Sequence, residues 1–275
     1  MVEARLQAIG THPGRGSHGL PRFVARSEAL RCYRRHQRPD RTGTVSVGDF
    51  DADRIAEGLR TLFTTPGDPS IRPPLFSPEA EQRGLRESAL ELPGDPTIVF
   101  AWRIPPGTSR SGLDLLAHLL GQGPSSLLGR RLQGETHLAR RVDMFPSYPG
   151  LQRPSRFVLR IVCAEWDRTL YERLVREGQD VVSRLRERGF DEEEFGLARG
   201  SLMAQRLTLI GDESKLAARM ARDLGTLGKI DLLPPDQKAC EALIDRILDR
   251  SRLTVVRTAL DSFEVEQPKK KEEDR

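Results

Sequence analysis

The sequence predicts an α+β fold in which a largely antiparallel sheet is covered on one face by helices. From residue 86 onward, the apolar patterns follow the order strand, strand, two helices, strand, strand, several helices and a last strand. The strands come in adjacent pairs that can form hairpins, whereas the helices come in runs that can gather on one face. The segment TIVFAWRI is a dense apolar run, which is typical of a central strand.

The first 63 residues contain too few elements to close a sheet alone. Residues 1–22 are rich in Gly, Pro, His and Arg without an apolar period, and we expect loop or extended chain there. Ser27 is the expected N-cap of a helix that stops near Pro39. A short strand is expected at 44–47, followed by a helix capped by Asp51. The apolar residues on one face of that second helix are Ile55, Leu59, Leu62 and Phe63.

A proline-rich segment divides the chain. Residues 64–85 hold five prolines and no apolar period, so we expect an extended linker. It separates an incomplete unit, residues 1–63, from a complete unit, residues 86–262. The charged tail, residues 263–275, is expected to be disordered.

The complete unit begins with strands at 86–92 and 96–103. Ser111 is the expected cap of the helix that follows, and after a Gly-Gln-Gly-Pro break a second helix is expected to open at Ser125. Strands are expected at 140–144 and 156–163, joined by a turn rich in Pro, Gly and Tyr.

The remainder of the unit is mainly helical. Asp167 is the expected cap of a long amphipathic helix with Leu170, Leu174, Val181 and Leu185 facing inward. Further helices are expected at about 191–209, 212–228 and 235–249, and a last strand at 253–260.

Composition and charge exclude several functional classes. The 275 residues carry a formal net charge of +4, yet no stretch is both basic and rich in aromatic residues, so we expect no nucleic-acid partner. No apolar run has signal-peptide length or reaches the roughly 18 residues of a transmembrane helix, so we expect a soluble chain with no membrane partner. The three cysteines form no Cys-x-x-Cys pair and are expected to be free thiols, which favours the cytoplasm.

The histidines do not form a zinc site. His-x-x-Glu-His is absent in either direction, and none of the five histidines has a second one within five residues that could share its helical face. His118 lies on an otherwise apolar helix and is interpreted as a satisfied core or boundary histidine. We therefore expect no metal ligand and no catalytic residue in this chain.

Two charged clusters each have a structural interpretation. Asp191 and the three glutamates after it are typical of a helix start, where negative charge favours the helix dipole. Arg130, Arg131, Arg140 and Arg141 form either a solvated face with ion pairs or a wall that attracts acidic peptides.

Four segments, in this order and spacing, resemble the insulinase/pitrilysin family of zinc metallopeptidases over about residues 10–262. They are HPGRGSHGLPRFVARSEALRCYRRHQRPDRTGTVSVGDFD, DADRIAEGLRTLF, IPPGTSRSGLDLLAHLLGQGPSSLLGRRL, and FDEEEFGLARGSLMAQ with the later LIDRILDRSRLTVV. The resemblance implies two α+β units facing each other across a closed chamber, of which the first binds zinc. It identifies this chain as the last part of a first unit, a linker, and a whole second unit.

The resemblance also implies a function and candidate residues. The expected function is that of a non-catalytic half, which closes a chamber over a zinc-bearing half and helps bind extended peptides for hydrolysis. Zinc is expected in the partner half or in a missing N-terminal half, and the chain alone is expected to be inactive. Active relatives place an Arg and a Tyr seven residues apart, where this sequence has Gln133 and Arg140. These two, with Ser125 and Ser126, are the candidate substrate-binding residues. The alternative is a catalytically silent scaffold or assembly subunit of the same fold.

Overall fold

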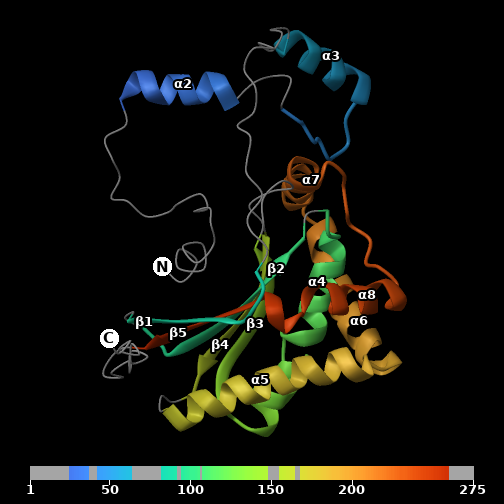
Figure 1. Ribbon diagram of the computed structural model, residues 1–275. Coiled ribbons are helices and arrows are strands. Elements are labelled where there is room, and N and C mark those ends of the chain that lie inside the picture. The colour runs from blue at the N-terminus through green and yellow to red at the C-terminus, as the bar shows by residue number, and fades with distance from the viewer. Residues whose placement is uncertain are drawn as a thin grey trace.

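The computed structural model describes residues 25–36, 42–63, 82–91, 94–105, 107–147, 155–164 and 168–259. Within these ranges it is an α+β structure with one five-stranded sheet (Figure 1). The strands are β1 (Arg86–Glu91), β2 (Thr97–Ile104), β3 (Ala139–Ser147), β4 (Ser155–Cys163) and β5 (Leu253–Ala259). The linker up to residue 81, the β3–β4 turn and the charged tail lie outside the described residues.

The sheet has the order β1-β5-β2-β4-β3, so β2 is its central strand as predicted. β2 pairs antiparallel with β4 and β5, and β3 pairs antiparallel with β4. Only the pairing of β1 with β5 is parallel within the described part of the sheet. The prediction of a largely antiparallel sheet is therefore confirmed, with one parallel edge.

The α-helices that follow β2 among the described residues are α4 (Arg110–Leu120), α5 (Arg168–Arg188), α6 (Glu192–Ile210), α7 (Glu213–Leu227) and α8 (Gln237–Ile247). Four of them pack on one face of the sheet, and α7 packs on α6 (Figure 1). Phe100 and Trp102 of β2 belong to a core cluster with Leu116 of α4, Leu174 of α5 and Ile244 of α8. Alternate β2 residues, Val99 and Ala101, point to the opposite face, where a smaller cluster contains no helical residue among the described ranges.

Local capping chemistry explains several helix starts. Asp191 and Glu194 form a reciprocal capping box at the start of α6, so the acidic run marks a helix start as predicted. Asp51 accepts hydrogen bonds from the backbone of Asp53 and Arg54, as expected for the cap of α3 (Ala52–Leu62). At α4, however, the cap is Ser109 and not Ser111, because the Ser109 side chain accepts from the Gly112 backbone at 3.1 Å.

The residues before the linker differ in two respects from the prediction. The helix α2 (Arg26–His36) begins at Arg26, which places Ser27 inside the first turn. Residues 44–47 form no strand, since no strand lies beside them within the described residues. Gly43, just before this stretch, lies close to α7, because a Cβ added there would be 3.0 Å from a Leu224 methyl carbon.

α3 keeps an exposed apolar face. No α3 residue is buried, and Leu62 is 78% exposed. Among the described residues, no helix is long and apolar enough to cross a membrane.

Candidate functional site

The candidate site is the corner between the end of α4 and the start of β3, residues 121–140. Glycines make this corner compact. The Gly123 backbone has φ of +87°, a left-handed conformation that favours glycine. Gly129 lies against it, because a Cβ there would be 2.4 Å from the Gly123 carbonyl oxygen. A larger residue at Gly129 would collide with the Gly123 carbonyl, whereas at Gly123 it would meet open space but strain the backbone.

Ser126 holds this loop together. Its side chain is buried, donates to the Gly123 carbonyl at 2.7 Å and accepts from the Gly129 backbone at 3.1 Å. Both hydrogen-bonding directions of the hydroxyl are thereby used within the loop. Ser126 therefore supports the fold of the loop and does not reach its surface.

Residues Gly129–Glu135 form a π-helix (η2) and not the ordinary α-helix expected from Ser125. The helix ends where the Thr136 backbone donates to the Arg131 carbonyl, five residues earlier, at 3.1 Å. Leu128 and Leu132 are fully buried and anchor this wide turn to the core. The wider turn changes which side chains of the corner face β3.

The structure brings Gln133 and Arg140 together through the backbone. The Gln133 side-chain amide donates to the Arg140 carbonyl at 2.8 Å. His137, between them, has φ of +51° and its Nδ1 lies 2.8 Å from the Gln133 carbonyl oxygen. Gln133 therefore fixes the route of the chain from η2 into β3.

Arg140 occupies an irregularity at the start of β3. Ala139 pairs with Cys163 and Arg141 pairs with Val162, which leaves Arg140 as the extra residue of a bulge. Its guanidinium is exposed and lies 3.8 Å from the Asp95 carboxylate. An exposed pair at this distance contributes little to stability, so the Arg140 side chain is available to a ligand.

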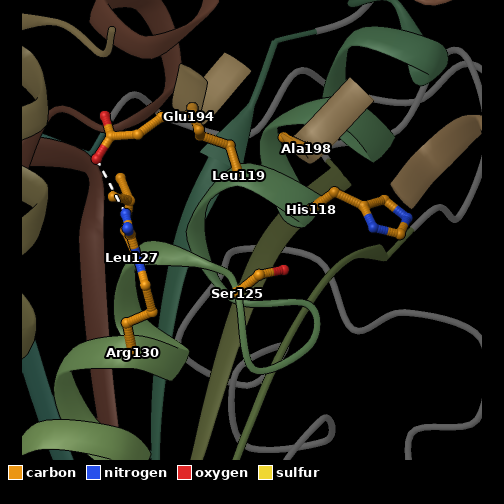
Figure 2. Close-up of a pocket in the computed structure, with 7 residues that line it drawn as sticks. All are labelled: His118, Leu119, Ser125, Leu127, Arg130, Glu194 and Ala198. Atoms are coloured by element: carbon orange, nitrogen blue, oxygen red, sulfur yellow. Dashed lines mark hydrogen bonds and ion pairs between the residues drawn. The ribbon is translucent and has the colours of Figure 1, made fainter. Parts of the chain in front are cut away.

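Ser125 lines a small cavity with His118, Leu119, Leu127, Arg130, Glu194 and Ala198 (Figure 2). Its volume of about 10 Å³ is on the order of one water molecule. The Arg130 guanidinium donates to Glu194 at 3.0 Å across this cavity. Because Glu194 also belongs to the capping box of α6, this pair ties the corner to the helical layer.

His118 is a satisfied boundary histidine, as predicted. Its Nδ1 lies 3.0 Å from the Ser201 hydroxyl and its Nε2 lies 3.2 Å from the Gln205 side-chain oxygen. Its ring points away from the Arg130–Glu194 pair in Figure 2. Burial is the main cause that lowers the pKa of His118 below its usual value, so the ring is neutral near neutral pH.

The four arginines of the corner take part in local ion pairs. Their partners are Glu194 for Arg130, Glu177 and Glu135 for Arg131, Asp95 for Arg140, and Asp143 for Arg141. The Arg131–Glu177 pair raises the pKa of Arg131 and lowers that of Glu177. This arrangement matches the solvated face with ion pairs, and it leaves little net positive charge on the corner.

Zinc does not fit the residues described. No group of three or more His, Cys, Asp or Glu residues within the described ranges could hold a metal ion. His118 and His137 each have a ring nitrogen within hydrogen-bonding distance of a neighbouring group.

Beyond the corner, β3 is the last strand of the sheet. Among the described strands it pairs with β4 alone, so its other side has no strand partner. Sequence reasoning missed both the bulge at Arg140 and the π-helix. The only local signal for a wide turn was the density of glycines at 121, 123, 129 and 134.

The family comparison gives a definite result. A family profile described as "Peptidase M16 inactive domain" matches residues 24–202, which is more than half of the chain. No curated protein matches the sequence significantly.

Three solved structures share the fold. A protease from Helicobacter pylori is 19% identical, with a TM-score of 0.65 over 78% of this chain and 54% of that chain. A peptidase M16 inactive domain from Pseudomonas fluorescens is 15% identical, with a TM-score of 0.67 over 94% and 66% of the two chains. The periplasmic protease PqqL from Escherichia coli is 13% identical, with a TM-score of 0.59 over 78% and 26%.

This chain therefore spans less than two thirds of the length of each of these structures. Such identities establish the fold and no more. Together with the profile match, they confirm the resemblance to insulinase/pitrilysin metallopeptidases: the chain belongs to the peptidase M16 family, as its inactive domain.

Proposed function

We propose that this chain is the non-catalytic half of a zinc metallopeptidase. It closes a chamber over a zinc-bearing half and helps bind an extended peptide for hydrolysis. The zinc-bearing half is a separate chain or an upstream segment of the same gene product. The residues 1–63 belong, on this proposal, to the end of a first peptidase-like unit.

The observation that carries the proposal is the free side of β3. An unpaired strand edge offers backbone N–H and C=O groups to an extended peptide, which can add as a further strand. β3 is nine residues long and ends the sheet among the described strands. Recognition through the backbone tolerates many peptide sequences, which suits a general peptidase chamber.

The corner contributes at one end of this edge. The Gln133 side-chain amide already donates a hydrogen bond to the Arg140 carbonyl, so the two candidate residues have different roles. Gln133 positions the bulge, and the exposed Arg140 guanidinium contacts the peptide backbone or a carboxylate. Ser125 and Ser126 shape the loop beneath, Ser126 through its two hydrogen bonds.

An apolar stripe on α6 supports a partner half. Met203, Leu207 and Ile210 follow one another at helical spacing and are 40%, 66% and 58% exposed. The neighbouring face of α6, about a quarter turn away, buries Phe195 and Leu202 in the core. The apolar surface of α6 therefore extends beyond the part that the core covers, and we propose that the partner half covers the stripe.

A scaffold function is the second candidate. The side chains of Gln133 and Ser126 form hydrogen bonds with neighbouring backbone groups of the same chain. Residues that bind a peptide would instead direct such groups toward the ligand. A silent assembly subunit would retain this fold and its partner surface, without affecting peptide turnover.

The deciding experiment combines this chain with a zinc-bearing half. That half is a protein carrying His-x-x-Glu-His that co-purifies with the chain or is encoded immediately upstream of it. We expect chelator-sensitive peptidase activity only from the combination. We expect Arg140→Ala to raise the KM for peptide several-fold with little change in kcat, because it removes a binding contact.

Arg60→Ala is the matched control, since Arg60 is also an exposed arginine in a surface ion pair. It should leave the KM unchanged. A complex that forms but shows no peptidase activity would favour the scaffold. Stoichiometric zinc in the chain purified alone would refute the proposal.

A further inference from the structure

A second site lies outside the corner, in a cleft between α4, α6 and α7. The cleft has a volume of about 510 Å³ and shares no lining residue with the small cavity at Ser125. Its charged lining consists of Arg110, Arg206, Lys215, Arg219, Arg222 and the single acid Asp114. Five cations face one anion.

Part of this positive charge is balanced inside the protein. The fully buried Asp223 accepts from Arg110 Nη1 at 2.9 Å and from Arg219 Nε at 3.1 Å. Arg219 Nη2 donates in turn to Asp114 at 2.7 Å. Two guanidinium groups and two carboxylates thus form a neutral network on one side of the cleft.

Arg206 is not balanced in this way. The residue is 7% exposed, and both its Nη1 and Nη2 atoms are buried without a hydrogen-bond partner among the described residues. Burial is the main cause that lowers its pKa, but a guanidinium stays charged at any pH the fold tolerates. A buried cation in this state requires an anion, because buried charges in proteins are paired.

The cleft also has an apolar wall. Leu202, Leu209 and Ala218 line it beside the cationic groups. A volume of about 510 Å³ lies within the range of sites that enclose small molecules. Guanidinium groups match carboxylates and phosphates through paired N–H donors.

We propose that this cleft binds a small organic oxyanion, a carboxylate or phosphate attached to a compact apolar body. The oxyanion pairs with Arg206 and the apolar body packs on Leu202 and Leu209. Arg222, which is exposed at the cleft, attracts the ligand from solution, whereas the exposed Lys215 is paired with Asp212 at 2.8 Å. The proposal does not depend on the zinc-bearing half.

Titration calorimetry of the full chain tests the proposal with four probes. Phenyl phosphate and benzoate carry the two candidate anions on one apolar body, inorganic phosphate lacks the body, and benzyl alcohol lacks the charge. We expect saturable binding of phenyl phosphate or benzoate, and at least tenfold weaker binding of the other two probes. The tighter of the first two identifies the anion class.

Arg206→Met keeps the apolar stem and removes the charge. We expect this variant to bind the anionic probe at least tenfold more weakly than the unaltered chain does. Its unfolding midpoint should stay at or above that of the unaltered chain, because the substitution removes an unpaired buried charge. Arg60→Met is the control and should bind normally. Thr208→Glu is a second variant, because Thr208 is exposed on the cleft lining and its new carboxylate competes with the ligand.

The proposal is overturned if neither phenyl phosphate nor benzoate saturates, or if benzyl alcohol binds as tightly as they do. It is also overturned if both Arg206→Met and Thr208→Glu bind like the unaltered chain. A lower unfolding midpoint for Arg206→Met would assign Arg206 a structural role and refute the unpaired charge.

Discussion

The sharpest stability prediction concerns Asp223, the carboxylate that links α4 to α7. Asp223→Ala removes the group that both Arg110 and Arg219 contact. The side-chain exposures are 0% for Asp223, 9% for Arg110 and 17% for Arg219, so solvent screens this pairing poorly. Breaking a buried pair costs about 3–5 kcal/mol, because a charge is left in the interior. Arg219 retains Asp114, which places our expectation at the lower end, about 3 kcal/mol.

Urea unfolding followed by far-ultraviolet circular dichroism measures this loss directly. For a chain of this size, about 3 kcal/mol corresponds to a fall in Tm of roughly 6–12 °C. The control is Glu57→Ala, which breaks an ion pair whose side chains are both 75% exposed, and it should cost less than about 1 kcal/mol. If Asp223→Ala costs no more than Glu57→Ala, the network does not hold α4 and α7 together.

Three further outcomes are expected. The pKa of His118 is lowered in the folded state, so as the pH drops the unfolded chain takes up a proton before the folded chain does. The free energy of unfolding should therefore fall below about pH 6.5, by at most about 1.4 kcal/mol per pH unit. His118→Gln should remove this pH dependence, as measured by urea unfolding at a series of pH values. Burial raises the pKa of Cys163 to about 11 and of Cys240 to about 12, so in a Cys32→Ser background neither thiol should react with a disulfide reagent at pH 8 until urea unfolds the chain. Gln133→Ala should cost about 1 kcal/mol in the same unfolding assay, since one hydrogen bond to the Arg140 carbonyl is lost.

Each of these has a clear contrary result. A pH profile that is the same with and without His118 would mean that the ring is protonated equally in both states. Rapid thiol reaction in the folded chain would show that α8 or β4 opens locally. An unchanged urea midpoint for Gln133→Ala would mean that the bulge is held without the amide.

The sequence alone was sufficient to identify the central strand of the sheet. The run TIVFAWRI predicts a central strand because neither face of it is polar, and β2 buries Phe100 on one face and Val99 on the other. The capping predictions at Asp51 and Asp191 were correct because a cap is decided within about four residues.

Predictions failed where a distant residue decides the outcome. Ser109 and Ser111 are both plausible caps by local chemistry. In the structure the hydroxyls of both serines donate to Asp231, which is 120 residues away from Ser111, and Ser109 is the one that also accepts from the Gly112 backbone. Similarly, a stretch of β-branched residues at 44–47 becomes a strand only if another strand lies beside it. The pairing of Arg110 with Asp223 could not be predicted for the same reason, because the two residues lie 113 positions apart in the sequence.

The two proposed sites differ in how their positive charges are balanced. At the corner, each arginine of the basic cluster has a carboxylate partner, so we expect a peptide there to be held mainly through the backbone of β3. The Arg140 pair is the longest of these, at 3.8 Å, and both of its groups are exposed. In the cleft, the uncompensated charge is buried at Arg206 and attracts an anion. Arg140→Ala should therefore change peptide KM without changing binding of the anionic probe, and Arg206→Met should do the reverse. If either variant altered both properties equally, the corner and the cleft would be parts of one site.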